Sequence, residues 1–475
     1  MNKQISKDFG GILKFEQQGI LHDAHFRVHD DLVLLLPDSI ECRKAIYDSS
    51  MSAKAGNEED KWLFGLTESG YSVAFYKPAG LQVHMSAPVD LGKASFNTPV
   101  VLQSEGPDIV DLNSFDVIEF RGGIMDLLQL PGKAVDEKYF KEKRIEFRDK
   151  EAFTTTFPIY VNGESFEVIY TVSLSDYSTE TGMVPDLRKN IHSALRFRFF
   201  QEQPIWKFKT YYWYALQLFQ FCTRRLNIGF EVRLYKKMNG RTYTIITKVK
   251  DGFDDYANDV LNFSQIIRFD FLGDKFPQLF KLLNEEETQP SLLFLPKRNN
   301  EANSILYTNV TDICVALETE SDFAKANLLK KIREEAKALA AELNKLIDAS
   351  QYDVSVKDKA KGIINGNLPE MKLSLREKIF SLYDEFAEPM KFITEPAFHA
   401  ELGITKSYTN EDFKKLIRKF IKIRNLAAHA GFSWNEGYEI YGHLQLIVYF
   451  SILKRAGYTI EESQQILYQL FGHLF

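Results

Sequence analysis

The pattern of apolar residues changes near residue 305 of this 475-residue chain, and this change limits the fold more than any other feature. Before it, short runs rich in β-branched and aromatic residues predict strands. After it, apolar residues recur every three or four positions, which is typical of amphipathic helices. We therefore expect a multidomain α+β protein, with a β-rich region over residues 1–300 and an all-α bundle over residues 305–475.

Two Asn-Gly pairs, at Asn162 and Asn239, each lie between apolar runs of strand length. Asn and Gly both tolerate positive φ, so each pair predicts a tight hairpin. With the other short runs, these hairpins indicate a sandwich-like or barrel-like region of one lobe or two. A charged stretch near residues 131–149 marks the sub-boundary if there are two. One helix with an aromatic face is expected within this region, over residues 209–224.

The C-terminal part predicts a bundle of four or five helices. Ser374 with Glu377, and Thr459 with Glu462, form capping boxes, and Thr409 or Asn410 is placed to cap another helix. Glycines at 431 and 457 are placed to end helices. The expected helices run over 311–349 with a break near Ser321, over 375–393 with Pro389 as a kink or early end, over 411–430, over 439–456, and from 459 toward the C-terminus.

The helix expected over 411–430 carries an unusual residue on its apolar face. That face consists of Phe413, Leu416, Ile417, Phe420, Ile423 and Ala427. Arg424 lies one turn after Phe420 and points into it, although a buried charge is costly unless a partner meets it. Asn425 and His429 are four residues apart and stack on one side. On an ideal helix His429 lies well round from Arg424, so one shared site needs a distorted helix end, a second chain, or both.

The run Arg424-Asn425-Leu426-Ala427-Ala428-His429 resembles the RNxxxH motif of HEPN ribonucleases. An Arg five places before a His arises by chance in roughly a third of such chains, and an Asn after the Arg lowers this to roughly one in fifty. The setting late in a helical bundle is also similar. The overall plan, a β-rich region before a HEPN domain, resembles the ApeA-type abortive-infection proteins of bacteria. For residues 1–300 this likeness is one of general character.

The resemblance implies a metal-independent endoribonuclease acting in anti-phage defence by abortive infection. The RNA 2′-OH would attack the adjacent phosphorus and leave a 2′,3′-cyclic phosphate and a 5′-OH. His429 would move protons, because its pKa lies near neutrality, and Arg424 would hold phosphate oxygens. Asn425 would orient the phosphate or the His. The resemblance also implies a homodimer or a higher even oligomer. Because a free RNase harms its host, we expect the N-terminal region to restrain it until a phage-derived trigger arrives.

The same helix is locally basic. Lys415, Lys419 and Lys422 are candidates for binding RNA, although a solvated helix face explains them equally well. Trp434 is a candidate for stacking on a base, and packing in a core is the alternative. For the motif itself, the alternative is that Arg424 pairs with a core carboxylate and His429 caps a helix.

Composition limits the kinds of site and the cellular compartment that we expect for this protein. The net charge is −6 and the pI about 6.0, so any polyanion site must be a local patch. With three scattered cysteines and no apolar stretch of signal-peptide or membrane-spanning length, we expect a cytoplasmic protein without membrane contact. His22, His25 and His29 fall on an apparent strand and on opposite faces, so we expect no metal site and no cofactor.

The alternative to an enzyme is a binding protein. In that hypothesis the helical domain is a non-catalytic, HEPN-like dimerisation module and the β-rich region binds a ligand or nucleic acid. The intact Arg-Asn-x3-His favours the enzyme, because a degenerate motif would be expected of a pure binding module.

Overall fold

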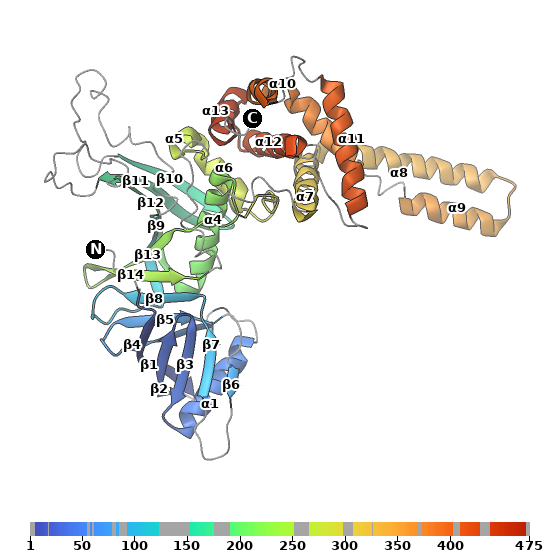
Figure 1. The fold of residues 1–475 in the computed structure, drawn as a ribbon. Coiled ribbons are helices and arrows are strands. Elements are labelled where there is room, and N and C mark those ends of the chain that lie inside the picture. Colours follow the sequence, from blue (N-terminus) through green and yellow to red (C-terminus); the bar gives the residue numbers. More distant parts are fainter. Residues whose placement is uncertain are drawn as a thin grey trace, which may run out of the picture. The chain divides into compact units, whose positions relative to one another are not determined.

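A computed structural model describes most of the chain, which divides into two compact units (Figure 1). Unit 1 comprises residues 1–222 and 227–286, and unit 2 comprises residues 223–226 and 287–475. The described residues are 5–17, 19–54, 58, 61–77, 82–84, 93–122, 153–174, 191–250, 266–297, 307–324, 326–367, 373–401, 409–427 and 438–471. The sub-boundary expected near 131–149 lies outside them.

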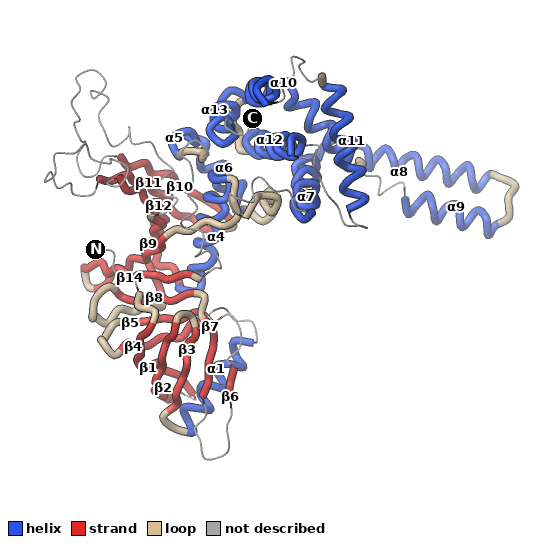
Figure 2. The backbone as a smooth tube through the Cα atoms, in the orientation of Figure 1, coloured by secondary structure: helices blue, strands red, loops and turns tan. Residues whose placement is uncertain are grey.

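Unit 1 contains the strands, as Figure 2 shows in red. The strands are β1 (Asp8–Gln17), β2 (Ile20–His29), β3 (Leu32–Pro37), β4 (Trp62–Thr67), β5 (Ser72–Tyr76), β6 (Gln82–His84), β7 (Lys93–Asn97), β8 (Val100–Ser104), β9 (Ser114–Arg121), β10 (Phe153–Val161), β11 (Glu164–Leu174), β12 (Ile191–Pro204), β13 (Glu231–Met238) and β14 (Arg241–Val249). Its helices are α1 (Ile40–Lys54), α4 (Phe208–Thr223), α5 (Phe269–Leu272) and α6 (Phe276–Asn284).

The described strands form one antiparallel ladder in the order β10-β11-β12-β9-β13-β14-β8-β5-β4-β1-β2-β3-β7-β6. The α+β class is therefore confirmed. The expected sandwich-like or barrel-like region takes the form of a single open sheet, with β10 and β6 at its ends. Strands distant in sequence are neighbours, because β9 lies between β12 and β13 and β8 lies between β14 and β5.

Both Asn-Gly hairpins are confirmed. Asn162 and Gly163 have φ of 48° and 78°, and they join β10 to β11 with Val161 opposite Glu164. Asn239 and Gly240 have φ of 50° and 74°, and they join β13 to β14. Two successive positive φ values define the type I′ turn, whose twist matches that of the flanking strands. Local sequence thus fixes the register of these two pairs.

The expected helix over 209–224 is α4, and its aromatic residues form the core against the sheet. The Tyr211 ring lies 4.4 Å from that of Phe199 on β12 and 6.2 Å from that of Phe115 on β9. Along β12, buried Leu195 and Phe197 alternate with arginines that pair with glutamates of neighbouring strands. The sheet therefore packs one face on α4 and presents its charged side chains on the other.

Unit 2 is helical. Its helices are α7 (Tyr307–Ala324), α8 (Ala326–Ala349), α9 (Val354–Asn367), α10 (Leu375–Glu401), α11 (Asn410–Ala427), α12 (Tyr438–Arg455) and α13 (Ile460–Phe471). α12 is the central helix, because its residues from Leu444 to Leu453 are all buried and it packs against α7, α10, α11 and α13. α8 and α9 pair as an antiparallel hairpin (Figure 1). No helix within the described ranges has the length and apolarity needed to cross a membrane.

Three predicted helix boundaries, at Ser374, Gly457 and Thr459, are confirmed by their capping groups. The Ser374 amide donates to Glu377 Oε2 over 2.7 Å, and the Thr459 amide donates to Glu462 Oε2 over 2.7 Å. Gly457, with φ of 87°, ends α12, and the following amide, of Tyr458, donates back to the Leu453 carbonyl. These are the reciprocal bonds of capping boxes and a Schellman-type end.

The expected end of the second helix near Ile393 is wrong, because α10 continues past Pro389 to Glu401. A proline inside a helix costs about 3 kcal/mol through a lost hydrogen bond and a steric clash. Here the packing on either side opposes that cost, since Phe386 and Met390 are buried. The Pro389 carbonyl also accepts a hydrogen bond of 3.0 Å from Gln464 of α13.

Candidate active site

The helix that carries the Arg-Asn motif is α11, and its start is well defined. The Thr409 hydroxyl donates to Asp412 Oδ2 over 2.7 Å, and the Asp412 amide donates to Thr409 Oγ1 over 3.2 Å. The bond from the Thr409 hydroxyl is the main cause that lowers the pKa of the Asp412 carboxyl, followed by a bond from Lys415, and both favour the charged form. An acidic side chain in the first turn also interacts favourably with the helix dipole. Thr409, and not Asn410, is therefore the residue that caps α11.

One face of α11 is packed into unit 2. Phe413, Ile417 and Phe420 are buried, as their helical spacing predicted. The Phe413 ring stacks on Tyr383 of α10 at 4.3 Å and lies 5.0 Å from the ring of His443 on α12. α11 also contacts α7. The helix is thus held by three neighbours along the face that leads to Arg424.

Arg424 lies half-buried in the last turn of α11. Its guanidinium is close enough to the Cys314 thiol of α7 to favour the thiolate. Burial outweighs this effect and raises the pKa of Cys314 to about 12. The expectation of an arginine directed toward the packed side of the helix is consistent with this placement, since Cys314 is fully enclosed.

Of the three motif side chains, the structure describes that of Arg424. Asn425 lies on α11, but its side chain is outside what the structure describes. His429 and Trp434 also lie outside the described residues, as does Gly431, the expected helix end. The described part of α11 runs to Ala427, so the expected end at Ala430 lies outside it. The composite site therefore stays a prediction, of which the structure places one member.

The basic residues of α11 are exposed. Lys415, Lys419 and Lys422 all lie on the solvent side of the helix. Lys415 pairs with Asp412 of its own helix at 3.2 Å, and it keeps 68% of its side chain accessible. A further cation, Lys414, pairs with Asp384 of α10 at 2.7 Å. The exposed lysines leave a positive surface beside the end of α11 that carries Arg424.

A group of polar residues around Arg224 forms part of unit 2, although no sequence pattern predicted it. Arg224 directly follows α4, has a φ of 55°, and belongs to unit 2. Its Nη1 donates to Oε1 of Gln445, which is buried on α12. Gln445 also hydrogen-bonds Tyr441, and Tyr441 lies near Cys314. A chain of neighbouring side chains thus leads from Arg224 toward Arg424. From the sequence, only the position of Arg224 at the end of a helix was predicted.

The histidines of β2 make separate contacts. His25 lies 3.7 Å from Asp38, and His29 pairs with Asp8 at 2.5 Å. Within the described ranges, no group of three or more His, Cys, Asp or Glu side chains is arranged to hold a metal ion.

Comparisons with protein-family models, curated proteins and solved structures find no match to this chain.

Proposed function

We propose that this chain is a metal-independent endoribonuclease of the HEPN type that acts in bacterial anti-phage defence by abortive infection. The observation that carries the proposal is the position of Arg424: half-buried, in the last turn of α11, at the start of an Arg-Asn-x3-His sequence. An arginine is costly to bury, so its retention at a helix end favours a role that needs its charge. The exposed lysines of α11 supply an approach for a polyanion.

In the proposed reaction the RNA provides its own nucleophile. The 2′-oxygen bonds to the adjacent phosphorus as its proton is withdrawn, and the bond from phosphorus to the 5′-oxygen breaks. The leaving 5′-oxygen takes a proton, and a 2′,3′-cyclic phosphate remains. His429 is the group assigned to the proton transfers, because imidazole gains and loses a proton near pH 7. Arg424 is assigned to the phosphorane, whose two non-bridging oxygens fit a planar guanidinium.

The proposal includes a second copy of the chain. On an ideal helix Arg424 and His429 point in different directions, so a site built from two copies of the motif is the simplest way to bring both to one phosphate. A homodimer, or a higher even oligomer, is therefore part of the proposed enzyme. The substrate class is RNA.

The proposal also includes restraint by the N-terminal region. Residues 223–226 begin at the last residue of α4 and group with the helices of unit 2. Within this segment Arg224 contacts Gln445, and Gln445 is linked through Tyr441 to the surroundings of Cys314 and Arg424. We assign the restraint to this segment, because it follows α4 along the chain and its Arg224 contacts Gln445 of α12. A phage-derived trigger would release it.

The test compares RNA ends rather than loss of RNA alone. Bacteria expressing the chain are sampled before and after phage infection, and purified protein is incubated with total RNA in EDTA. Cyclic-phosphate and 5′-OH ends are expected with the wild type and are expected to be absent with Arg424→Ala and His429→Ala. Arg376→Ala, an exposed arginine at the start of α10, is the control and should cleave normally. Cleavage by either motif variant would contradict the proposal.

A further inference from the structure

β1 and β4 approach each other unusually closely at one point in the sheet. They pair at only three positions, the last being Leu13 opposite Gly65. A Cβ added at Gly65 would lie 2.1 Å from the Ile12 carbonyl oxygen, and one added at Gly11 would lie 2.1 Å from the Leu66 carbonyl oxygen. Only glycine fits at such distances, so both glycines are required for the two strands to meet here.

Beyond this point the pairing of the two strands stops. β1 continues to Gln17 and β4 begins at Trp62, so the same register would place Lys14 opposite Phe64 and Phe15 opposite Leu63. Neither pair forms. On its other edge β4 stays paired with β5 throughout this stretch. The described part of the sheet therefore contains an internal gap, along which β4 presents a strand edge without a strand partner.

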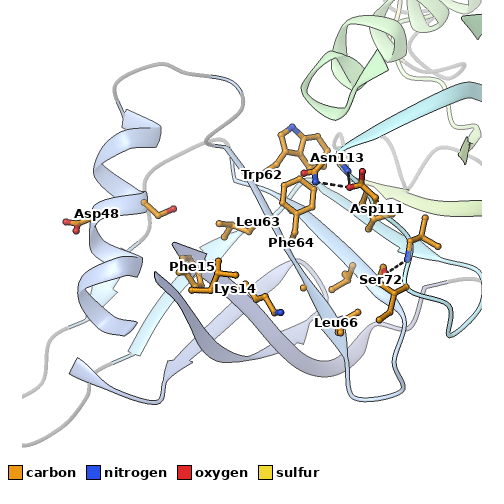
Figure 3. A pocket seen from close by; sticks show the side chains of 17 residues that line it. Lys14, Phe15, Asp48, Trp62, Leu63, Phe64, Leu66, Ser72, Asp111 and Asn113 are labelled. Atoms are coloured by element: carbon orange, nitrogen blue, oxygen red, sulfur yellow. Dashed lines mark hydrogen bonds between the residues drawn. The ribbon is translucent and has the colours of Figure 1, made fainter. Parts of the chain in front are cut away.

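A cleft of about 770 Å³ lies at this gap (Figure 3). Its walls come from β1, β4 and the loop over residues 109–113, with Ser49 of α1 and Ser72 of β5 at its margin. Figure 3 shows Asp48, the other α1 residue at the margin, directed away from the strands. The volume is that of a ligand site rather than of a packing defect.

Hydrogen bonds within unit 1 fix the loop wall. The Val110 amide donates to Ser72 Oγ over 2.9 Å, and the Asn113 amide donates to Asp111 Oδ1 over 3.0 Å. The Asn113 carbonyl accepts from the Ile205 amide over 2.7 Å. The cleft is thus formed before any ligand arrives, which reduces the entropy lost on binding.

The chemistry of the cleft favours an extended apolar segment. Ile109 and Leu21 expose 77% and 60% of their surfaces, and Phe64 is half-buried on β4. Trp62 exposes only 4% of its surface, and its Nε1 has no hydrogen-bond partner within the described structure. Lys14 is the basic residue among the described lining side chains. Apolar contacts, backbone groups in strand spacing and one cation together match a peptide strand.

We propose that this cleft binds an extended peptide, which adds to the free edge of β4 as a strand. Its backbone amides and carbonyls would pair with β4, its bulky apolar side chains at alternate positions would cover Phe64 and Ile109, and an acidic residue would face Lys14. This binding activity goes beyond RNA cleavage and does not rest on it. The expected partner is therefore an extended segment of another protein, in which bulky apolar residues alternate with acidic ones.

The test uses the full chain and a defined pool of labelled octapeptides, acetylated and amidated, in which Phe, Leu, Ile or Val alternates with Glu, Ser or Lys. Fluorescence anisotropy measures the affinity of each. The expected result is binding by Glu-containing members, with at least tenfold weaker binding to Ile109→Asp. Ile40→Asp is the matched control, because Ile40 is also an exposed isoleucine of unit 1 but lies outside the cleft, on α1.

Backbone N-methylation separates strand addition from other ways of binding. A tight-binding octapeptide methylated at alternate amides keeps its side chains but loses the donors on one edge. If it pairs with β4, methylation on that edge should weaken binding at least tenfold, while methylation on the other edge should not. Equal binding of both methylated forms would overturn the proposal in favour of a side-chain or small-molecule pocket. Failure of every pool member to distinguish wild type from Ile109→Asp would overturn it as well.

Discussion

Arg224 Nη1 donates a hydrogen bond of 3.3 Å to Oε1 of Gln445, across the interior of the helical unit. Part of the Arg224 residue is exposed, but its guanidinium is enclosed and lies 5.2 Å from the centre of the Phe471 ring. This burial lowers the pKa of Arg224, while nearby Tyr449 and Tyr441 oppose the effect. Arg224 also adopts a positive φ, which is unfavourable for a residue with a long side chain. Both the burial of its guanidinium and its positive φ are unfavourable for Arg224, and the hydrogen bond to Gln445 helps to offset them.

Gln445→Leu should therefore destabilise the protein by about 1–3 kcal/mol, because it removes the acceptor for an enclosed guanidinium. Gln445→Glu has the same shape and supplies a carboxylate, so it should be markedly more stable than Gln445→Leu. Urea unfolding of the two variants and the wild type measures this order. If the leucine variant were as stable as the glutamate variant, the Arg224–Gln445 bond would not contribute to the stability of unit 2.

A buried ion pair joins α7 to the end of α12. Glu320 is fully buried, and its carboxylate accepts hydrogen bonds from Arg455 Nη1 at 2.6 Å and from Ser451 Oγ at 2.8 Å. Glu320→Gln should cost about 3 kcal/mol, since it leaves the Arg455 charge without its partner. Ser451→Ala, which removes only a neutral hydrogen bond, should cost about 1 kcal/mol.

A double-mutant cycle provides the sharper check on this pair. Glu320→Leu combined with Arg455→Met removes both charges, and apolar replacement of a whole buried pair is often close to neutral. The double variant should therefore unfold at a higher urea concentration than Glu320→Leu alone. Strictly additive losses would mean that the two side chains do not act as a pair.

Acid sensitivity of unit 1 should depend on Glu202. Lys236 has only 4% of its side chain exposed, and its ammonium contacts both Glu202 and the Ser114 hydroxyl. The hydrogen bond from Lys236 is the main cause that lowers the pKa of Glu202, followed by the bond from Ser114. A lowered folded-state pKa means that the pair stabilises the fold above the unfolded value of about 4.3. This stability is lost as pH falls through the folded-state value.

Glu202→Gln should accordingly be less stable than the wild type at pH 7 by about 1 kcal/mol, a small value because the carboxylate is half-exposed. The difference should shrink as pH falls from 5 to 3 (about one unit either side of the unfolded glutamate pKa). Thermal unfolding at a series of pH values measures both quantities. A difference that does not change with pH would show that packing, and not charge, accounts for the loss.

The features that the sequence predicted well are those set by neighbouring residues. The Asn239-Gly240 turn and the Ser374–Glu377 capping box each depend on a few adjacent residues, and both form as expected. α9 was not predicted, because its own residues carry no helical pattern. It contains Gly362 and Gly366 and buries no residue, so it has no apolar periodicity to detect. It is held by contacts with α8, including Asn344 Nδ2 to Asn365 Oδ1 at 2.7 Å.

Features set by distant residues could not be predicted. The gap between β1 and β4 depends on a close approach at Gly65, which no local pattern reveals. The apolar stripe of α8 was visible in the sequence, but whether it would be buried was not. Leu346 of this stripe remains 68% exposed. For the candidate site, helix periodicity predicted that Arg424 points toward the packed side of α11, and its half-buried position is consistent with this. The Arg424 charge acts on the Cys314 thiol, which lies more than a hundred residues away in sequence and had no signal of its own.

The last prediction concerns the exposed lysines of α11 and rests on the proposed function. Lys419→Glu and Lys422→Glu should each weaken RNA binding, because a phosphate contact is replaced by repulsion. The measurement is the affinity for single-stranded RNA at several salt concentrations. Each lost contact should reduce the slope of log affinity against log salt by about 0.7, which general unfolding or altered shape would not do. Lys415→Glu should act less strongly, since Lys415 lies near the start of α11 and is further along the helix from Arg424 than Lys419 and Lys422.

Lys331→Glu on α8 is the matched control, because it makes the same change of net charge at a lysine that is 72% exposed. It should leave both the affinity and the slope close to those of the wild type. An equal effect of all four substitutions would indicate that overall charge governs binding. No effect of Lys419→Glu and Lys422→Glu would remove the exposed face of α11 as the RNA-binding surface.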